Sequence, residues 1–178
     1  MTMPRGFTVV VRLVYGDHMS EGDGSALLAV RAEREILNLI HRYCELVDGG
    51  RLNEVARLFV DAETFMGGPD LPPTPNHLLA ATQRRFMKFH GDTPRTRHVV
   101  NNLIIDIDPH GSTAEARSYY TVFQGVDGIR IVLMGRYHDR FDVGPDSRWR
   151  FRRRDWYVDF MGDVSEHLLI DVRPTGES

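Results

Sequence analysis

The pattern of apolar and polar positions divides the chain into a helical first part and a strand-rich second part. From residue 27 to residue 48 the apolar side chains recur at the spacing of one helix face, which predicts a long amphipathic helix. The inward stripe of this helix consists of Ile36, Ile40, Tyr43 and Val47. Two glycines, at positions 49 and 50, predict that the helix ends there.

Two further helices and a short strand are expected before the strand-rich part begins. A second helix is predicted for residues 53–59, and the segment AETFMG that follows is typical of a short strand. A loop rich in Gly and Pro, residues 67–75, separates this strand from a third helix. Thr74 is expected as the N-cap of the third helix and Pro75 as its first helical residue.

The second part of the chain carries four long runs of β-branched and aromatic residues, which predict four strands. The runs are RHVVNNLIIDID, TAEARSYYTVFQG, IRIVLMGRYHDRFD and WRFRRRDWYVDF. The segment VDG between the second and third runs is typical of a tight hairpin. Helices followed by an antiparallel meander indicate an α+β domain. We expect a curved antiparallel sheet wrapped on three N-terminal helices, which makes a cone that encloses a pocket.

The composition fits one soluble globular domain. The chain has 178 residues, of which 42% are hydrophobic and 26% charged, and its formal net charge is −3. We expect residues 27–162 to form the domain, residues 1–26 a flexible N-terminal extension and residues 163–178 a C-terminal tail. Within the extension, Met19 opens a stretch that is typical of a natural protein start.

The charge distribution and the cysteine content limit which partners and which cellular compartment are expected. No long basic run appears, which argues against nucleic acid as the main partner, and the most basic stretch, RWRFRRR, reads as one strand face. The N-terminal apolar run is interrupted by Arg12 and is too short for a membrane span, so no membrane partner is expected. The single cysteine, Cys44, excludes an internal disulfide and favours a reducing, cytoplasmic location.

Asp48 stands at the end of the first predicted helix, where its charge has the wrong sign. The C-terminus of a helix carries the negative pole of the helix dipole, so a carboxylate there is disfavoured by roughly 0.3–1 kcal/mol. Either Asp48 is a solvated surface acid, or it faces inward to a partner.

Four segments of the chain are informative together: YCELVDGGRLNEVARLF, TRHVVNN, GRYHDRF and WRFRRR. In their order and spacing, over about residues 27–160, they resemble the SnoaL-like branch of the NTF2-like superfamily of cone-shaped α+β barrels. Within that branch the chain is most similar to the group of scytalone dehydratase, bile-acid 7α-dehydratase and lindane dehydrochlorinase. These enzymes share an Asp at the end of the first helix and a His at the start of the strand after the third helix. Asp48 and His98 stand at those positions here, and Tyr43 matches a tyrosine of the bile-acid enzyme five residues before the Asp.

The resemblance implies a lyase or isomerase that needs no cofactor and no metal. Asp48 would accept a hydrogen bond from one imidazole nitrogen of His98 and fix its tautomer, so that the other nitrogen acts as a general acid and base. Tyr43 would donate a hydrogen bond that polarises a carbonyl of the substrate. The substrate would be a small, mostly apolar ring compound of polyketide or steroid type, and elimination of water fits best.

The alternation of side chains along the strands predicts further pocket residues. His98, Val100, Asn102 and Ile104 share one face of their strand, which places Asn102 below His98. The expected substrate-binding residues are Asn102, Tyr120, Phe59, Phe65, Met66, Phe86, Val100 and Tyr137. Arg154 is a further candidate for contact with an anion or a carbonyl.

Each of these residues also has a plain structural interpretation. Asp48 can be a turn acid beside the glycines, His98 a structural histidine, and Tyr43 a core tyrosine. The fold itself also serves non-catalytic proteins, such as the small subunit of ring-hydroxylating dioxygenases, or ligand-binding proteins. A structural subunit would show a filled cone and a large apolar face for its partner, whereas an enzyme needs the Asp–His pair open to a cavity. A homodimer or homotrimer is expected in either case.

Other motifs add no chemistry. A phosphate loop, a dinucleotide fingerprint and a GxSxG elbow are all missing from the sequence. His138 and Asp139 are neighbours on one predicted strand and point to opposite faces, so they are not expected to share a metal ion. The remaining histidines are expected in loops, on polar helix faces or in the tail, and are given no role in the chemistry. They are His18, His41, His77, His90, His110 and His167.

Overall fold

The computed structural model describes residues 21–68 and 70–169, and these form three helices and five strands. The helices are α1 (Glu21–Asp48), α2 (Leu52–Leu58) and α3 (Asn76–Phe86). The strands are β1 (Glu63–Met66), β2 (Thr96–Ile107), β3 (Thr113–Val126), β4 (Gly128–Val143) and β5 (Trp149–Met161). Helix α1 therefore begins six residues before its predicted start, within the expected N-terminal extension, while Met19 lies outside the described residues. None of the described helices is long and apolar enough to cross a bilayer.

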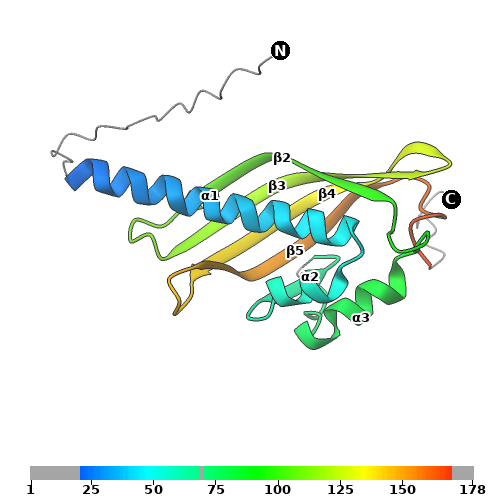
Figure 1. Ribbon diagram of the computed structural model, residues 1–178, viewed down its shortest axis with the longest axis horizontal. Helices are drawn as coiled ribbons and strands as arrows, with labels where there is room; N and C mark the ends of the chain where they lie inside the picture. Colours follow the sequence, from blue (N-terminus) through cyan, green and yellow to red (C-terminus); the bar gives the residue numbers. More distant parts are fainter. Residues whose placement is uncertain (1–20, 69, 170–178) are drawn as a thin grey trace, which may run out of the picture.

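The five strands make one mixed, unclosed sheet in the order β1-β5-β4-β3-β2. The meander from β2 to β5 is antiparallel throughout, as the four strand-like runs predict. Strand β1 departs from the expected antiparallel sheet because it pairs in parallel with β5, at the opposite edge from β2. Figure 1 shows the long, twisted strands of the meander running side by side behind α1.

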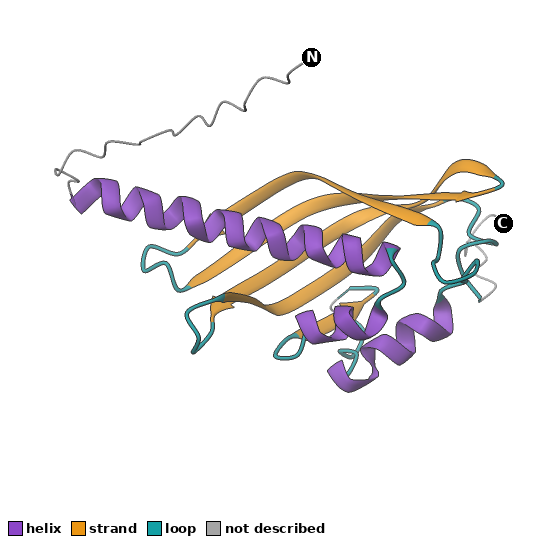
Figure 2. Cartoon of the chain, viewed as in Figure 1, coloured by secondary structure: helices purple, strands orange, loops and turns teal. Residues whose placement is uncertain are grey.

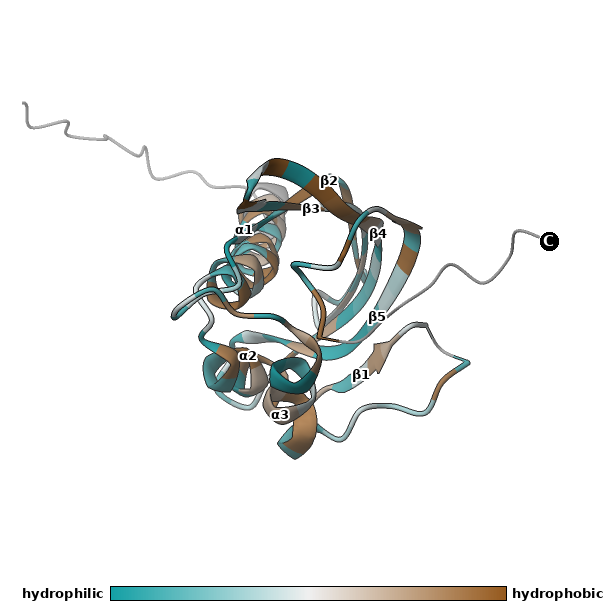
Figure 3. Ribbon diagram, turned by 90° about the vertical axis from the view of Figure 1, so that its right-hand side faces the viewer, coloured by the Kyte–Doolittle hydropathy of each residue, from teal (hydrophilic) through white to brown (hydrophobic). Residues whose placement is uncertain are grey.

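Helix α1 supplies the second layer of the fold. It runs across the concave side of the sheet, while α2 and α3 lie together near its C-terminal end (Figure 2). Seen from that end, the sheet forms a curved wall beside the helices (Figure 3). All four residues of the predicted stripe, Ile36, Ile40, Tyr43 and Val47, are buried in this interior. The prediction of an α+β fold with a curved sheet wrapped on helices is confirmed.

The two glycines after α1 end the helix by a specific backbone turn. The N–H of Gly50 donates to the carbonyl of Val47 at 3.0 Å, and the N–H of Arg51 donates to that of Leu46 at 2.9 Å. This pair of bonds is the Schellman motif, which needs a residue with positive φ, and Gly50 has a φ of 71°. A side chain at Gly50 would also collide with the carbonyl oxygen of Asp92. The turn therefore fixes Asp48 as the last residue of the helix.

The start of α3 differs from its prediction, because Thr74 is not its N-cap. The backbone N–H of Thr74 donates to the carbonyl of Thr64 at 2.7 Å, and the hydroxyl of Thr64 donates to the carbonyl of Thr74 at 3.2 Å. These bonds use Thr74 to tie the loop to β1. Pro75 stands at the N-cap position instead, without a side-chain cap.

Strand β2 contains a bulge that changes which side chains face inward. The pairing register with β3 shifts between Asn101 and Ile104, and Asn102 has a φ of 48°. As a result Asn102 and Ile104 are exposed, while Leu103 and Ile105 turn towards the core. The predicted shared face of His98, Val100, Asn102 and Ile104 is therefore wrong beyond Val100, because uniform alternation does not survive a bulge.

A charged pair lies in the centre of the core. The guanidinium of Arg154 on β5 donates two hydrogen bonds to the carboxylate of Asp139 on β4, at 2.7 and 2.6 Å, and both side chains are fully buried. Four aromatic rings surround the guanidinium, with centroids 4.3–5.5 Å from its carbon. They belong to Tyr43, Phe59, Tyr137 and Phe151. Arg154 thus joins the sheet to Tyr43 of α1 and to Phe59, which directly follows α2.

Arg154→Met should lower the free energy of unfolding by about 3–5 kcal/mol, because it leaves the Asp139 carboxylate buried without its partner. The double variant Asp139→Leu/Arg154→Met should lose less than the single variant, since no unpaired charge remains. Urea unfolding followed by circular dichroism measures both. Arg152→Met, at an exposed arginine on the same strand, is the matched control and should change stability little. A double variant less stable than the single one would contradict the coupling of the two charges.

Candidate functional site

A cavity of ≈ 320 Å³ opens between the end of α1, the end of α3, the concave face of the sheet and residues 167 and 168. Its lining is mostly apolar and, within the described residues, includes no Lys, Arg, Asp or Glu. Six of the predicted site residues line it: Tyr43, Met66, Phe86, His98, Tyr120 and Tyr137. The cone is therefore hollow at this end, and its hollow is suited to an uncharged, largely apolar molecule.

Four residues predicted to bind substrate lie elsewhere. Phe59 is fully buried behind the cavity, where its ring packs against that of Phe151 at 4.6 Å between centroids. Phe65 has the guanidinium of Arg153 stacked on its ring, 4.2 Å from the centroid, and does not reach the cavity. Val100 packs against the core beside the cavity, and Asn102 is exposed at the bulge. Short strands and bulges change the facing of a residue, which sequence alternation alone does not reveal.

Asp48 and His98 form a close pair at the cavity wall. The Nδ1 atom of His98 lies 2.6 Å from Oδ1 of Asp48. The backbone N–H of His98 donates to Oδ2 at 2.9 Å, and the hydroxyl of Thr96 donates to Oδ1 at 2.7 Å. The buried carboxylate of Asp48 thus receives three hydrogen bonds from the first residues of β2. The acid at the end of α1 faces inward to a partner.

These contacts also decide the charge of Asp48. Burial raises the pKa of Asp48, but the hydrogen bonds and charge of His98, together with the hydroxyl of Thr96, outweigh burial and hold the pKa below its ordinary value. Asp48 is therefore ionised at neutral pH and accepts a hydrogen bond from the protonated Nδ1 of His98. Since Nδ1 carries the hydrogen, the second ring nitrogen, Nε2, is left with its lone pair.

Tyr43 stands beside this pair on the inward stripe of α1. Its ring centroid is 6.3 Å from that of His98 in an edge-to-face arrangement. Burial raises the pKa of Tyr43 to about 12, although Arg154, whose guanidinium lies 4.5 Å from the ring centroid, acts in the opposite direction. The hydroxyl of Tyr43 therefore keeps its proton and is suited to donate a hydrogen bond.

Tyr120 and Tyr137 line the cavity as a stacked pair, with ring centroids 4.3 Å apart. The hydroxyl of Tyr120 donates to the backbone carbonyl of Tyr157 at 3.0 Å, so its hydrogen is already used within the protein. Glycine at position 135 leaves space for this hydroxyl, because a Cβ there would come within 2.7 Å of it. Tyr120 is thus placed as an apolar wall rather than as a donor to a ligand.

Several cavity residues were not predicted from the sequence. Gln83 and Met87 come from the end of α3, Trp156 from β5, and His167 and Leu168 from the C-terminal segment. The tail carried a weak signal, the apolar pair after His167, but nothing in the sequence indicates where a tail folds back. Elsewhere, His138 is exposed and Asp139 is buried, and no three His, Cys, Asp or Glu side chains of the described chain gather as a metal site.

The sequence of this domain matches that of a known family. The model of the SnoaL-like domain family matches residues 29–155, and the chain belongs to this family. None of the curated proteins matches the chain.

Solved structures place the chain within the NTF2-like fold. An NTF2-like protein with a cystatin-like fold from Novosphingobium aromaticivorans superposes with a TM-score of 0.64 at 22% identity, covering 82% of this chain and 94% of that one. A candidate scytalone dehydratase from the same organism gives 0.59 at 25% identity, covering 87% and 98%. The β subunit of a candidate aromatic-ring-hydroxylating dioxygenase, also from that organism, gives 0.59 at 23% identity, covering 76% and 94%. The fold thus accommodates both enzymes and subunits, and the site must distinguish them.

Asp48→Asn should weaken the dependence of stability on acid pH. Because the pKa of Asp48 is lowered in the folded protein, the ionised carboxylate stabilises the fold above its ordinary pKa, and this contribution is lost as the pH falls through the folded-state value. The free energy of unfolding of the wild type should therefore fall more steeply below about pH 5 than that of the variant. Urea titrations across this pH range measure the difference.

Asp127→Asn is the matched control for this prediction, because Asp127 is exposed in the turn between β3 and β4. Its pH profile should follow that of the wild type. Equal slopes for the wild type and Asp48→Asn would show that the carboxylate gains nothing from its three donors.

Proposed function

We propose that the protein is a cofactor-independent lyase or isomerase that transfers protons on a small, neutral, ring-type substrate, with dehydration as the main reaction. The 2.6 Å contact between Asp48 and His98, placed on an apolar cavity, carries this proposal. A carboxylate that orients a neutral imidazole is a recurrent arrangement for general acid–base catalysis near neutral pH.

In the proposed dehydration, Nε2 of His98 removes a proton from the carbon next to a ketone. The electron pair of the broken C–H bond forms an enolate, whose oxygen Tyr43 stabilises by donating a hydrogen bond. The enolate then expels the hydroxyl group on the neighbouring carbon, and the protonated Nε2 returns its proton to that oxygen, so that water leaves. The product is an unsaturated ketone and His98 is neutral again. Isomerisation would use the same steps with the proton returned to another carbon.

The surroundings of the pair support this chemistry. Asp48 keeps its negative charge and stabilises the imidazolium that forms, while Tyr43 keeps its hydrogen for donation. The apolar walls exclude most water, which strengthens both interactions. A charged substrate would find no charged partner among the described lining residues, so the substrate is neutral.

The alternative of a non-catalytic subunit fits the site less well. A structural subunit has no need of a hollow cone, and filling it would stabilise the fold. Here the cavity is open, and a buried pair that would be expensive to maintain for stability alone lies at its wall. The likeness to a dioxygenase β subunit concerns the fold.

His98→Gln should abolish proton transfer and leave the fold intact. α-Tetralone is a neutral bicyclic ketone of suitable size, and NMR would follow the exchange of its α-protons for deuterium in heavy water. The β-hydroxy derivative of α-tetralone tests elimination, because loss of water gives a fluorescent naphthol. The wild type should accelerate both reactions, and His98→Gln should lower each rate constant by about 10²–10⁴-fold. Its stability should stay within about 1–2 kcal/mol of the wild type, since the substitution keeps a polar side chain of similar length.

Asn101→Gln, at an exposed position on the same strand, serves as the control for the assay. Rates for the wild type that equal the uncatalysed rates for both compounds, and for a panel of cyclic hydroxy ketones, would refute the proposed reaction. Equal rates for the wild type and His98→Gln would refute the assignment of the base.

A further inference from the structure

The C-terminal segment, residues 163–169, folds back over the cavity. The backbone N–H of Lys88 donates to the carbonyl of His167 at 2.8 Å, and the N–H of Leu169 donates to the carbonyl of Phe86 at 2.8 Å. Met87 and Leu168 face each other across this short bridge, and both line the cavity. We call residues 163–169 the cap. Backbone hydrogen bonds attach the cap to the residues at and after the end of α3, in the way that a neighbouring strand is held in a sheet.

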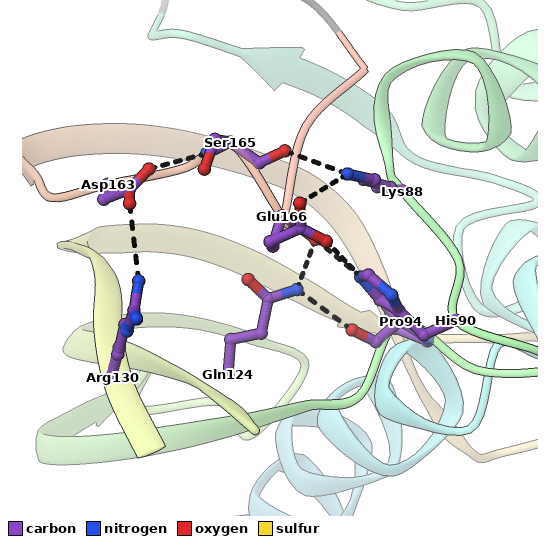
Figure 4. A network of polar contacts seen from close by, with 8 residues as sticks. All are labelled: Lys88, His90, Pro94, Gln124, Arg130, Asp163, Ser165 and Glu166. Carbon is purple, nitrogen blue, oxygen red and sulfur yellow. Dashed lines mark hydrogen bonds and ion pairs between the residues drawn. The ribbon is translucent and has the colours of Figure 1, made fainter. Parts of the chain in front are cut away.

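Polar contacts fix the cap at Glu166, next to His167 (Figure 4). The carboxylate of Glu166 accepts from the ammonium group of Lys88 at 2.7 Å. Its backbone carbonyl accepts from the amide of Gln124 at 2.7 Å and lies 2.8 Å from Nε2 of His90. The amide of Gln124 also donates to the carbonyl of Pro94, which ties β3, the start of β2 and the cap together. The residue beside His167 is thus held from three sides.

One nitrogen of the His167 imidazole lacks a hydrogen-bond partner among the residues that the structure describes. His167 is only 4% exposed and borders the cavity. Its Nδ1 atom is inaccessible and lacks a hydrogen-bond partner within residues 21–68 and 70–169. Buried polar groups without partners are uncommon in folded proteins and destabilise them. Because Nδ1 is inaccessible, only the other ring nitrogen, Nε2, can meet a ligand in the cavity that His167 borders.

A comparison with His98 indicates which role His167 can have. Asp48 fixes the tautomer of His98 and supports its positive charge, whereas no carboxylate within the described part of the chain forms a hydrogen bond or ion pair with the ring of His167. Burial and the charge of the nearby His98 together lower the pKa of His167 to about 4, although Asp48 acts in the opposite direction. His167 is therefore neutral when His98 works. A neutral imidazole whose hydrogen is on Nε2 can offer that N–H to an oxygen acceptor in the cavity.

We propose that His167 is the substrate-anchoring residue of the cavity and that it donates a hydrogen bond to the carbonyl oxygen of a neutral ring ketone. This inference rests on the proposed function, since it assigns the substrate's oxygen a place beside His98. A neutral donor binds a carbonyl without protonating it, so the reacting proton stays with His98 alone. Together with the uncharged lining, this defines the substrate class as uncharged ring compounds with a ketone near the reacting carbon, rather than carboxylates or amines.

The binding of a matched pair of compounds tests the anchoring role without any turnover. α-Tetralone and tetralin have almost the same shape and differ in the carbonyl group. The quenching of Trp156, which lines the cavity, reports the binding of each. The ratio of the two dissociation constants should change by roughly 2- to 10-fold in favour of tetralin when His167→Phe removes the donor. His167→Gln, which keeps an N–H, should retain part of the preference for the ketone.

His77→Phe, at an exposed position on α3, is the control and should leave the ratio unchanged. A second measurement uses the wild type alone, in case His167→Phe does not fold. Addition of α-tetralone should shift the side-chain nitrogen resonances of His167, while tetralin should not shift them. Unchanged resonances with bound α-tetralone, or an unchanged ratio in a folded His167→Phe variant, would overturn the anchoring role and leave the proposed function standing. Failure of both compounds and of the panel of cyclic hydroxy ketones to bind the wild type would overturn the proposed function and this inference together.

Discussion

One carboxylate, that of Asp48, joins the end of the long helix to the start of β2. It lies at a position where the helix dipole disfavours a negative charge. Three hydrogen-bond donors from Thr96 and His98 compensate for the unfavourable dipole. They can reach the carboxylate because the Schellman turn at Gly50 makes Asp48 the last residue of the helix. The same contacts set the ring of His98 against the cavity. A longer or shorter α1 would break the link between the two layers and the orientation of the imidazole at once.

The buried pair of Arg154 and Asp139 lies directly behind the aromatic wall of the cavity. Its guanidinium lies against the rings of Tyr43 and Tyr137, both of which line the cavity. The positive charge is neutralised by Asp139 and is shielded from the cavity by the aromatic layer. The cavity therefore keeps an uncharged surface while its floor remains rigid. Arg154 contributes by holding Tyr43 in place. It is fully buried and does not line the cavity, so the expected contact with an anion or a carbonyl is not possible there.

Local patterns along the chain predicted the fold well. The apolar period of α1, the glycines after it and the VDG hairpin each depend on neighbouring residues, and such signals can be read from one sequence. The parallel pairing of β1 with β5 could not be predicted, because it joins segments about ninety residues apart and no local preference selects parallel pairing. The bulge at Asn102 was hidden as well, since its residues carry no glycine or proline to mark it.

In the candidate site, too, features that depend on long-range contacts could not be predicted from local patterns. Asp48 and His98 were predicted as a pair, but only through resemblance to a family, because their contact spans fifty positions of the chain. Phe59 and Phe65 were expected at the cavity on the basis of their apolar character, which suits the core equally well. His167 was dismissed as a tail residue. Its position depends on contacts with Lys88, His90 and Gln124, which no pattern within the tail itself can show.

The cap of residues 163–169 keeps the proposed ligand contact on a different segment from the proposed proton-transfer pair. The pair of Asp48 and His98 is built on a helix end and a strand start, whereas His167 and Leu168 arrive on a short segment after the last strand. Substitutions or length changes in that segment alter the roof of the cavity without disturbing any strand pairing of the sheet. In evolution, or in protein engineering, the proposed ligand contact can therefore be changed while the proposed proton-transfer pair stays the same.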